Sequence, residues 1–431
     1  MNQNHIERRK RLAKTMGGGV AVLRTAPERI RNRDAHHPYR FDSNFYYLSR
    51  FPEPEAILVI IAEPSPKTVL FCRDKDLERE TWDGFRYGPD AARETFEVDE
   101  AYSITRVDDL VPKLLEDQTA MFFEVGNDPS WDNQVIGWLN TVRGQGRNGV
   151  GAPEQIHDIR SILDEMRLVK DASELDTMRQ AATISARAHC RAMQITRPGL
   201  KEYEVEAELL HEFRRSGSQS PAYTSIVAGG ANACVLHYVD NNAVLNDGDL
   251  LLIDAGCELN GYASDITRTF PVGGTFSGPQ RDIYELVLAA QAAAIEQVRP
   301  GNEWEDPHRA ALKVLAQGFI DLGLCKGTLD SVIESGDYRK FYMHRTGHWL
   351  GMDVHDVGDY KREGAWRKLE TGMVLTVEPG CYIRPAEDVA EQFWNIGVRI
   401  EDDAVVTGNS CEIITAEVPK KIAEIETLMR G

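Results

Sequence analysis

The sequence has no uninterrupted run of about 18 apolar residues, and residues 1–19 contain no apolar core of the kind that a secretory signal carries. We therefore expect neither a membrane-spanning helix nor a secretory signal. The seven cysteines are odd in number and none stands in CxxC spacing. This pattern argues against a disulfide framework and favours reduced thiols in a cytoplasmic protein.

Positive charge is scarce, because 49 Lys and Arg stand against 68 Asp and Glu, for a net charge of -19. So acidic a chain is a poor binder of nucleic acid and of anionic membranes, and we expect neither as a partner. With 42% hydrophobic and 27% charged residues, the composition is that of a globular protein. A length of 431 residues exceeds one ordinary core and predicts two domains.

The first domain is predicted to be α/β and to cover residues 1–165. An amphipathic helix is expected over residues 2–16, because three glycines follow it. The segments GVAVLRTA, EAILVIIAE and KTVLFCRD predict strands that alternate with helical stretches. A glycine-rich loop at 143–153 precedes QIHDIRSILDEMR, which predicts a helix at the domain boundary.

The second domain, residues 166–431, is predicted to be α+β. Helices are expected at about 173–195, 203–217, 280–298 and 303–322, the first of them capped by Ser173. Between them lie the strand-like runs SIVAGG, DLLLIDAG, ITRTFPV, MVLTVEPG and NIGVRIEDDAVVT. The order helix–helix–strand–strand occurs twice and suggests an internal duplication, although residue identity between the halves does not establish one.

Four acids and one histidine stand in apolar, strand-like or glycine-rich segments of the second domain. They are Asp254, Asp265, His348, Glu378 and Glu401. A buried carboxylate is costly unless it is paired or bound to a cation. Any one of the five could be an ordinary surface or capping residue, but the five together indicate a metal site.

The hairpin signal between the first two acids sets their relation. If Asn260–Gly261 forms a two-residue turn, Asp254 lies opposite Thr267 and Asp265 is its diagonal neighbour. If Leu259–Asn260 is the loop instead, the two acids face each other directly. Both registers place the carboxylates on one face, whereas a three-residue loop would place them on opposite faces.

Four carboxylates and an imidazole form a hard, oxygen-rich ligand set. Two divalent cations would balance the four negative charges, and the set suits Mn²⁺, with Co²⁺ and Zn²⁺ as alternatives. Two such ions hold a bridging water and lower its pKa toward about 7, which supplies a hydroxide nucleophile at neutral pH without a serine or cysteine. The predicted chemistry is therefore hydrolysis.

These motifs resemble those of the Xaa-Pro aminopeptidases (aminopeptidase P), the proline-specific branch of the pita-bread metallopeptidases. The resemblance rests on the IDAG context of Asp254, on residues 265–268, on HRTGHWLGMDVHD, on VEPG and on RIED. YRFDSNFYYLSRFPEPEAILVI is also similar to the smaller N-terminal domain of that family. The resemblance implies a pita-bread C-terminal domain with two pseudo-symmetric halves around the metals.

The same resemblance implies an exopeptidase, commonly manganese-dependent, that removes the first residue of peptides with proline in second position. The five residues above carry over as metal ligands without substitution. Further positions match the family's catalytic and substrate-binding residues: His237, His344, His355, Tyr382, Arg399 and Trp82. The Trp82 match implies a homodimer or homotetramer, because that tryptophan reaches a neighbouring subunit's site in oligomeric members.

The catalytic residues are predicted to be Glu378, His355 and His237. Glu378 is expected to move a proton from the water to the proline nitrogen, and His355 to stabilise the oxyanion. His237, His344 and Arg399 are expected to shape the proline pocket or the chain beyond it.

Two alternatives remain at this stage. A prolidase uses nearly the same ligands on Xaa-Pro dipeptides only, so the site residues do not separate the two activities. A metal-free peptide-binding protein on the same fold is a rival of another class, and the presence of all five ligands argues against it.

Overall fold

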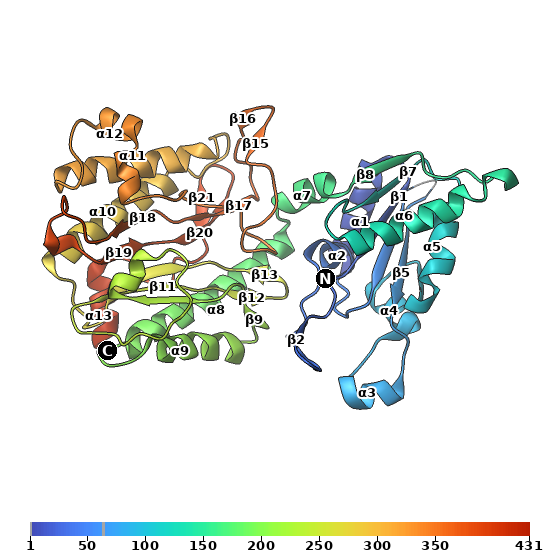
Figure 1. The fold of residues 1–431 in the computed structure, drawn as a ribbon, viewed down its shortest axis with the longest axis horizontal. Helices are drawn as coiled ribbons and strands as arrows, with labels where there is room; N and C mark the ends of the chain where they lie inside the picture. The colour runs from blue at the N-terminus through green and yellow to red at the C-terminus, as the bar shows by residue number, and fades with distance from the viewer. Residues whose placement is uncertain (1, 63–64) are drawn as a thin grey trace. The chain divides into compact units, whose positions relative to one another are not determined.

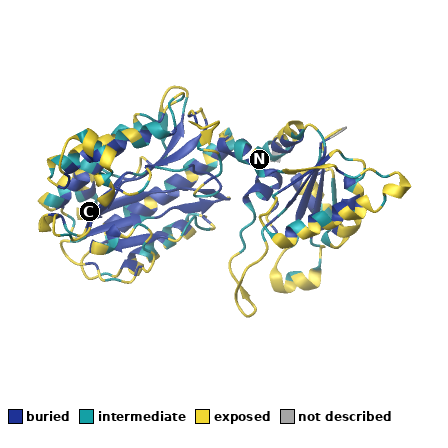
Figure 2. Cartoon of the chain, turned by 45° about the horizontal axis from the view of Figure 1, so that its top comes forward, coloured by how far each residue is buried: buried dark blue, intermediate teal, exposed yellow. Residues whose placement is uncertain are grey.

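The computed structural model describes residues 2–62 and 65–431, which form two compact units, Met1–Met166 and Arg167–Gly431 (Figure 1). In each unit the strands are largely buried and the exposed residues gather on helices and loops (Figure 2). Among the described residues, no helix combines the length and the apolar character needed to cross a membrane. None of the seven cysteines is in a disulfide.

The first unit is built on a six-stranded mixed sheet in the order β6-β5-β4-β1-β7-β8. Its strands are β1 (Val20–Arg24), β4 (Ile57–Ile61), β5 (Lys67–Cys72), β6 (Glu100–Ser103), β7 (Ala120–Phe123) and β8 (Gln155–Asp158). Its helices are α1 (Asn2–Met16), α2 (Ser43–Ser49), α3 (Leu77–Asp83), α4 (Gly88–Phe96), α5 (Val107–Leu115) and α6 (Pro129–Arg143), and a hairpin joins β2 (Ile30–Asn32) to β3 (Ala35–His36). The predicted first helix and the first three long strands are confirmed.

One predicted helix of this unit is wrong in its first half. Residues Gln155–Asp158 form β8, which pairs in parallel with β7, and helix α7 begins only at Arg160 and ends at Leu168. The sheet edge offers backbone hydrogen bonds that the local pattern does not reveal, and this tertiary pairing overrides a helical periodicity.

The second unit contains two pairs of packed helices. They are α8 (Ala172–Ile195) with α9 (Glu202–Arg215), and α10 (Gly278–Ile295) with α11 (Glu305–Asp321). The first helix is capped by Asp171 and not by Ser173, because the Asp171 carboxylate accepts the amides of Ser173 and Glu174 and Glu174 completes the capping box. Short helices α12 (Leu329–Ser335) and α13 (Ile422–Arg430) were not predicted.

A group of strands follows each helix pair. The first group comprises β9 (Ser220–Pro221), β10 (Ile226–Gly229), β11 (Leu250–Asp254), β12 (Cys257–Leu259), β13 (Tyr262–Ala263) and β14 (Thr267–Pro271). The second comprises β15 (Lys361–Arg362), β16 (Ala365–Trp366), β17 (Val374–Val377), β18 (Gly380–Ile383), β19 (Ile396–Arg399), β20 (Asp402–Val406) and β21 (Cys411–Ile413). Within this unit, α8 and α9 lie on one side of the strands and α10 and α11 on the other (Figure 1).

The two halves of the second unit meet along strand β14 and the junction of β19 with β20. The Glu401 amide donates to the Thr267 carbonyl (3.0 Å), and the Thr269 hydroxyl donates to the Arg399 carbonyl (3.0 Å). One large apolar cluster extends from α8 and α9 to the second group of strands. This seam brings the acids of the two halves to one place.

Candidate metal centre

The first two acids come from the β11–β14 hairpin. Asp254, at the end of β11, lies opposite Thr267 of β14, and Leu259 lies opposite Tyr262 across the turn. Asn260 and Gly261 form that turn with φ of 51° and 81°, the left-handed values that a type I′ turn requires. The first of the two predicted registers is therefore confirmed, and it makes Asp265 the diagonal neighbour of Asp254.

The other carboxylates follow strands of the second half. Glu378 comes directly after β17, where Pro379 ends the strand, and its amide donates to the Thr346 carbonyl (2.8 Å). Glu401 lies between β19 and β20, and its Oε2 accepts the Thr267 hydroxyl (2.7 Å). Each acid is thus held by the backbone of a buried strand end.

His348 lies on a segment that runs beside β17. Its amide donates to Thr376 Oγ1 (3.1 Å), and its carbonyl accepts the Thr376 amide (3.0 Å). Its Nδ1 lies 2.9 Å from the Trp349 carbonyl, which fixes the proton on Nδ1. Nε2 therefore faces the acids, 3.5 Å from Asp265 Oδ2 and 3.9 Å from Glu378 Oε1.

The predicted ligands therefore converge. Candidate ligand atoms of Asp265, His348 and Glu401 all lie within 4.8 Å of one another. Asp254, Asp265, His348, Glu378 and Glu401 line one cavity of about 420 Å³, together with His237, His344, His355 and Arg399. Nine of the eleven predicted site residues share this cavity, although they are spread over more than 160 positions of the sequence.

Arg399 joins the site to the aromatic residue that the sequence analysis selected. Its Nη2 donates to Asp254 Oδ2 (2.6 Å), and its Nη1 donates to the Tyr382 hydroxyl (3.0 Å). That hydroxyl lies 2.8 Å from His344 Nε2. A buried hydrogen-bonded chain therefore runs from His344 through Tyr382 and Arg399 to the first carboxylate.

Burial raises the pKa values of Glu378, Asp265 and Glu401. Burial, with the charges of Asp265 and Asp254, raises the pKa of Glu378 to about 7. Burial and the neighbouring carboxylates also raise the pKa of Asp265, and raise that of Glu401 well above its ordinary value. Only a compensating positive charge would let all of them ionise at neutral pH.

The histidines divide into two classes. Burial opposes the charged form of His348, but the contact with Asp265 and the charge of Glu378 outweigh it and raise its pKa to about 9. Burial and the charge of Arg399 lower the pKa of His344 to about 3, and burial lowers that of His355. His344 and His355 are therefore neutral groups at pH 7, able to donate or accept one hydrogen bond at each ring nitrogen.

The donor set fits divalent cations. Among the described lining residues, Arg399 and a protonated His348 contact these acids, and Arg345 pairs instead with Glu305, so the four carboxylates are undercompensated. Binding of a cation would displace the His348 proton and free Nε2 as a ligand. Carboxylate oxygens with one imidazole suit Mn²⁺ and related ions and do not suit copper or iron–sulfur chemistry.

Tyr223 belongs to the site and was missed from the sequence. Its hydroxyl lies between the two acids of the hairpin, 2.6 Å from Asp254 Oδ1 and in hydrogen-bond contact with Asp265 Oδ1. The Asp265 amide donates to Asp403 Oδ2 (3.1 Å), another buried acid that was not singled out. No local sequence signal marks Tyr223 as a site residue. Thr267, by contrast, could have been identified, because it lies two residues after Asp265 and therefore on the same face of the strand.

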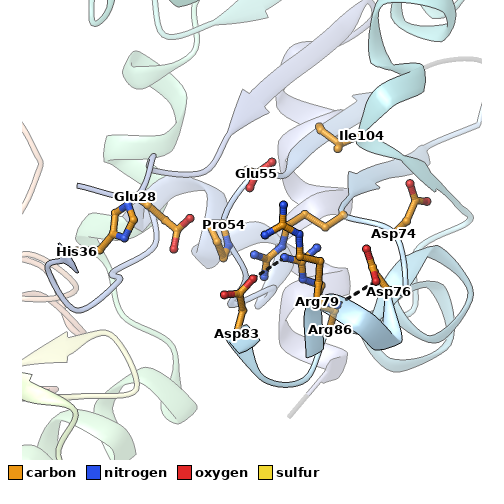
Figure 3. A pocket seen from close by; sticks show the side chains of 11 residues that line it. Glu28, His36, Pro54, Glu55, Asp74, Asp76, Arg79, Asp83, Arg86 and Ile104 are labelled. Carbon is orange, nitrogen blue, oxygen red and sulfur yellow. Dashed lines mark hydrogen bonds and ion pairs between the residues drawn. The ribbon is translucent and has the colours of Figure 1, made fainter. Parts of the chain in front are cut away.

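Trp82 does not line this cavity; it lies on α3 of the first unit and is 81% exposed. A second cavity, of about 780 Å³, is present in that unit, and charged side chains make up most of its lining (Figure 3). There Arg86 Nη2 donates to Asp83 Oδ2 (3.1 Å), and the Arg79 amide donates to Asp76 Oδ1 (3.0 Å). No predicted site residue lines it.

Both units match known families. Residues 176–408 match the family described as Metallopeptidase family M24, and residues 5–123 match the aminopeptidase P N-terminal domain. The Xaa-Pro aminopeptidase of Haemophilus influenzae is 48% identical over 98% of this chain and 96% of its own length. That of Escherichia coli is 44% identical over 99% of this chain and 97% of its own length.

Solved structures agree with the sequence relatives. The aminopeptidase PepP of Pseudomonas aeruginosa superimposes with a TM-score of 0.98 at 50% identity, covering 100% of this chain and 98% of that one. A zinc-substituted E. coli aminopeptidase P in complex with product gives a TM-score of 0.97 at 43% identity, with the same coverage. The resemblance inferred from the motifs and the pita-bread fold are thereby confirmed. This chain belongs to metallopeptidase family M24 and, within it, to the Xaa-Pro aminopeptidases.

Proposed function

We propose that this protein is a dinuclear-metal aminopeptidase that removes the first residue from peptides with proline in second position. The observation that carries the proposal is the cavity that brings the four carboxylates and His348 together with His237, His344, His355 and Arg399. Relatives named Xaa-Pro aminopeptidase at 44% and 48% identity support the same substrate class.

Two divalent cations, proposed to be Mn²⁺, would be held by Asp254, Asp265, His348, Glu378 and Glu401. Four negative charges in one cavity support two ions rather than one, because a single divalent ion would leave half of the charge uncompensated. When bound, such ions supply Lewis acidity toward the scissile carbonyl and a water molecule acidic enough to act as a nucleophile at neutral pH.

Glu378 is the proposed proton carrier. Burial raises the pKa of Glu378 to about 7 in the cation-free site, and bound cations would lower it, so that the carboxylate is ionised and able to act as a base toward water. Its Oε2 lies 3.9 Å from His344 Nδ1, and both residues line the cavity. Glu378 accepts the proton of the attacking water and delivers it to the proline nitrogen as the C–N bond breaks.

His355 is the proposed stabiliser of the oxyanion. Its ring lies 4.3 Å from that of His348, centroid to centroid and edge to face, so it borders the ligand cluster without belonging to it. As a neutral imidazole it can donate one N–H to a developing negative charge. His237, exposed in the wall of the same cavity, would shape the proline pocket and complete the catalytic set.

The proline specificity is assigned to the chain of His344, Tyr382 and Arg399. An Xaa-Pro bond has no N–H, and its ring restricts the backbone, so the site needs a shaped pocket more than hydrogen bonds to the amide. Tyr382 is 1% exposed and is fixed by both neighbours, which gives this wall a rigid shape.

We also propose the domain limits, the assembly and the compartment. Residues 1–165 would form the aminopeptidase P N-terminal domain and residues 166–431 the catalytic domain. Trp82 stands with Leu77 and Phe85 on an exposed apolar stretch, at 81%, 74% and 64% exposure, which supports a homodimer or homotetramer that covers it. Seven unpaired cysteines support a cytoplasmic location.

A peptide panel tests the proposal. The protein is stripped with EDTA, reconstituted with Mn²⁺ and given Xaa-Pro-Yaa, Xaa-Ala-Yaa and Xaa-Pro at equal concentrations. We expect the free first residue from Xaa-Pro-Yaa only, and only with metal. Preference for the dipeptide would favour a prolidase, and cleavage that survives EDTA would contradict the metal mechanism.

A further inference from the structure

A buried cluster of charges lies directly beside the loop that carries His348 and His355. Asp356 Oδ1 accepts Arg167 Nη2 (2.5 Å) and its Oδ2 accepts Lys170 Nζ (2.9 Å). The three side chains are 1% or 2% exposed. Burial would raise the pKa of Asp356, but the two cations outweigh it and lower the value, so the acid stays ionised.

Asp356 determines the fold of this loop through its backbone. Its amide donates to the Trp349 carbonyl (2.9 Å). The same carbonyl accepts the Nδ1 proton of His348 (2.9 Å). The anchored end of the loop therefore fixes the acceptor that sets both the orientation and the tautomer of the ligand histidine, and it also holds His355, the preceding residue.

The loop packs against the charge cluster too closely to shift without breaking it. A Cβ at Gly351 would lie 2.1 Å from Asp356 Oδ2 and 2.9 Å from Lys170 Cε. The Gly351 carbonyl accepts the amide of Ala263, on the hairpin that carries Asp265 (2.8 Å). The Lys170 amide donates to the Gly372 carbonyl (2.9 Å), just before the strand that leads to Glu378.

We propose that Asp356, held by Arg167 and Lys170, is a positioning residue that fixes His348 for metal binding and His355 for catalysis. This inference rests on the proposed function. A purely stabilising ion pair would change the stability of the fold alone, whereas an outer partner of a ligand histidine also changes metal affinity. The cluster lies outside the cavity, because none of its three members lines it.

The test uses the full chain carrying Asp356→Asn and Lys170→Met together, which removes one charge of each sign. Glu426→Gln is the control, since it breaks the Arg281–Glu426 ion pair (3.2 Å), whose members do not line the cavity. Mn²⁺ affinity is measured on EDTA-stripped protein with a chelating indicator, alongside thermal midpoints, kcat and KM. We expect the double variant to bind Mn²⁺ about 10–100-fold more weakly, with a lower kcat and a smaller change in KM.

The outcomes separate the claims. Parent-like affinity and kcat in the double variant, with only a lower thermal midpoint as in the control, would overturn the positioning role. A parent protein that bound no Mn²⁺ would overturn the proposed function as well. If the double variant does not fold, Gly351→Ala displaces Asp356 without changing charge; it should weaken Mn²⁺ binding, and parent-like binding would again overturn the inference. Arg167→Lys keeps a cation opposite Asp356 and should keep most of the parent's Mn²⁺ affinity.

Discussion

The carboxylates of the metal centre should destabilise the fold when no cation is bound, and Glu378→Gln measures this directly. Burial raises the pKa of Glu378 from 4.5 to about 7. The folded protein therefore holds a proton there more tightly than the unfolded chain does, and the associated stability, present below pH 4.5, is lost as pH rises through 7. Glutamine is neutral at every pH, like the protonated acid, so the variant does not lose stability as the pH rises.

The two pKa values set the size of the effect. In EDTA, linkage makes the variant more stable than the parent by about 1 kcal/mol at pH 5 and about 3 kcal/mol at pH 8. Mn²⁺ acts in the opposite direction, because at 1,000 times its dissociation constant it stabilises the parent by about 4 kcal/mol. Glu378→Gln lacks one of the proposed ligands, so Mn²⁺ should stabilise it less than the parent. At pH 8 we therefore expect the parent to be the more stable protein in excess Mn²⁺ and the variant to be the more stable one in EDTA.

Urea unfolding at pH 5, 6.5 and 8, with EDTA or with Mn²⁺, measures these differences. Because the two units can unfold separately, calorimetry is used to identify the transition of the second unit, whose midpoint temperature should rise when Mn²⁺ is added. Burial lowers the pKa of His189 and His308 to about 4, but both residues are present in parent and variant, so their contributions cancel.

Glu412→Gln is the control of opposite sign. A hydrogen bond from Arg179 lowers the pKa of Glu412, so its contribution is present above pH 4.5 and this variant should be the less stable protein at pH 8. A stability difference for Glu378→Gln that did not change with pH in EDTA, or that favoured the parent at pH 8, would refute the reasoning about the buried charge.

Other perturbations have distinct expected results. His355→Ala should lower kcat by about 10²-fold with little change in KM, measured on Xaa-Pro-Yaa, and the reverse split would make it a ground-state binding residue. Arg399→Lys should lower kcat/KM by about tenfold or more, because one ammonium cannot reach both Asp254 and Tyr382. Tyr223→Phe should destabilise EDTA-treated protein by about 1–2 kcal/mol in urea, and Mn²⁺-loaded protein less. Gly256→Ala places a Cβ 1.7 Å from the Ser264 carbonyl oxygen and should cost about 2 kcal/mol or more, whereas Gly408→Ala, with open space around it, should change the unfolding free energy by less than about 0.5 kcal/mol.

The residues that share the cavity could be selected from the sequence because a carboxylate in an apolar strand is an anomaly that local context exposes. Asp254 and Asp265 also lie on either side of an Asn260–Gly261 turn, so even their register followed from the chain. The family motifs extended this to nine of the residues that the cavity brings together. These signals lie within short segments of the chain, so they can be recognised from the sequence alone.

The remaining features depend on contacts between distant segments. Tyr223 stands in a loop without a motif, and only the folded chain brings its hydroxyl between two acids. Gln155–Asp158 became a strand because β7 offered a free edge, although its local pattern favoured a helix. Asp356 was visible only as the end of a histidine motif, because its partners Arg167 and Lys170 lie more than 180 residues away along the chain.

The division of the ligands between the two halves gives the cations a structural consequence. Asp254 and Asp265 come from the first group of strands, and Glu378 and Glu401 from the second. In the absence of cations, the repulsion between these acids acts across the seam where the halves meet, against hydrogen bonds such as that from Thr267 to Glu401. Cations held at the proposed site would turn that repulsion into attraction between the halves. The charges proposed to hold the metal therefore also make the stability of this unit dependent on it.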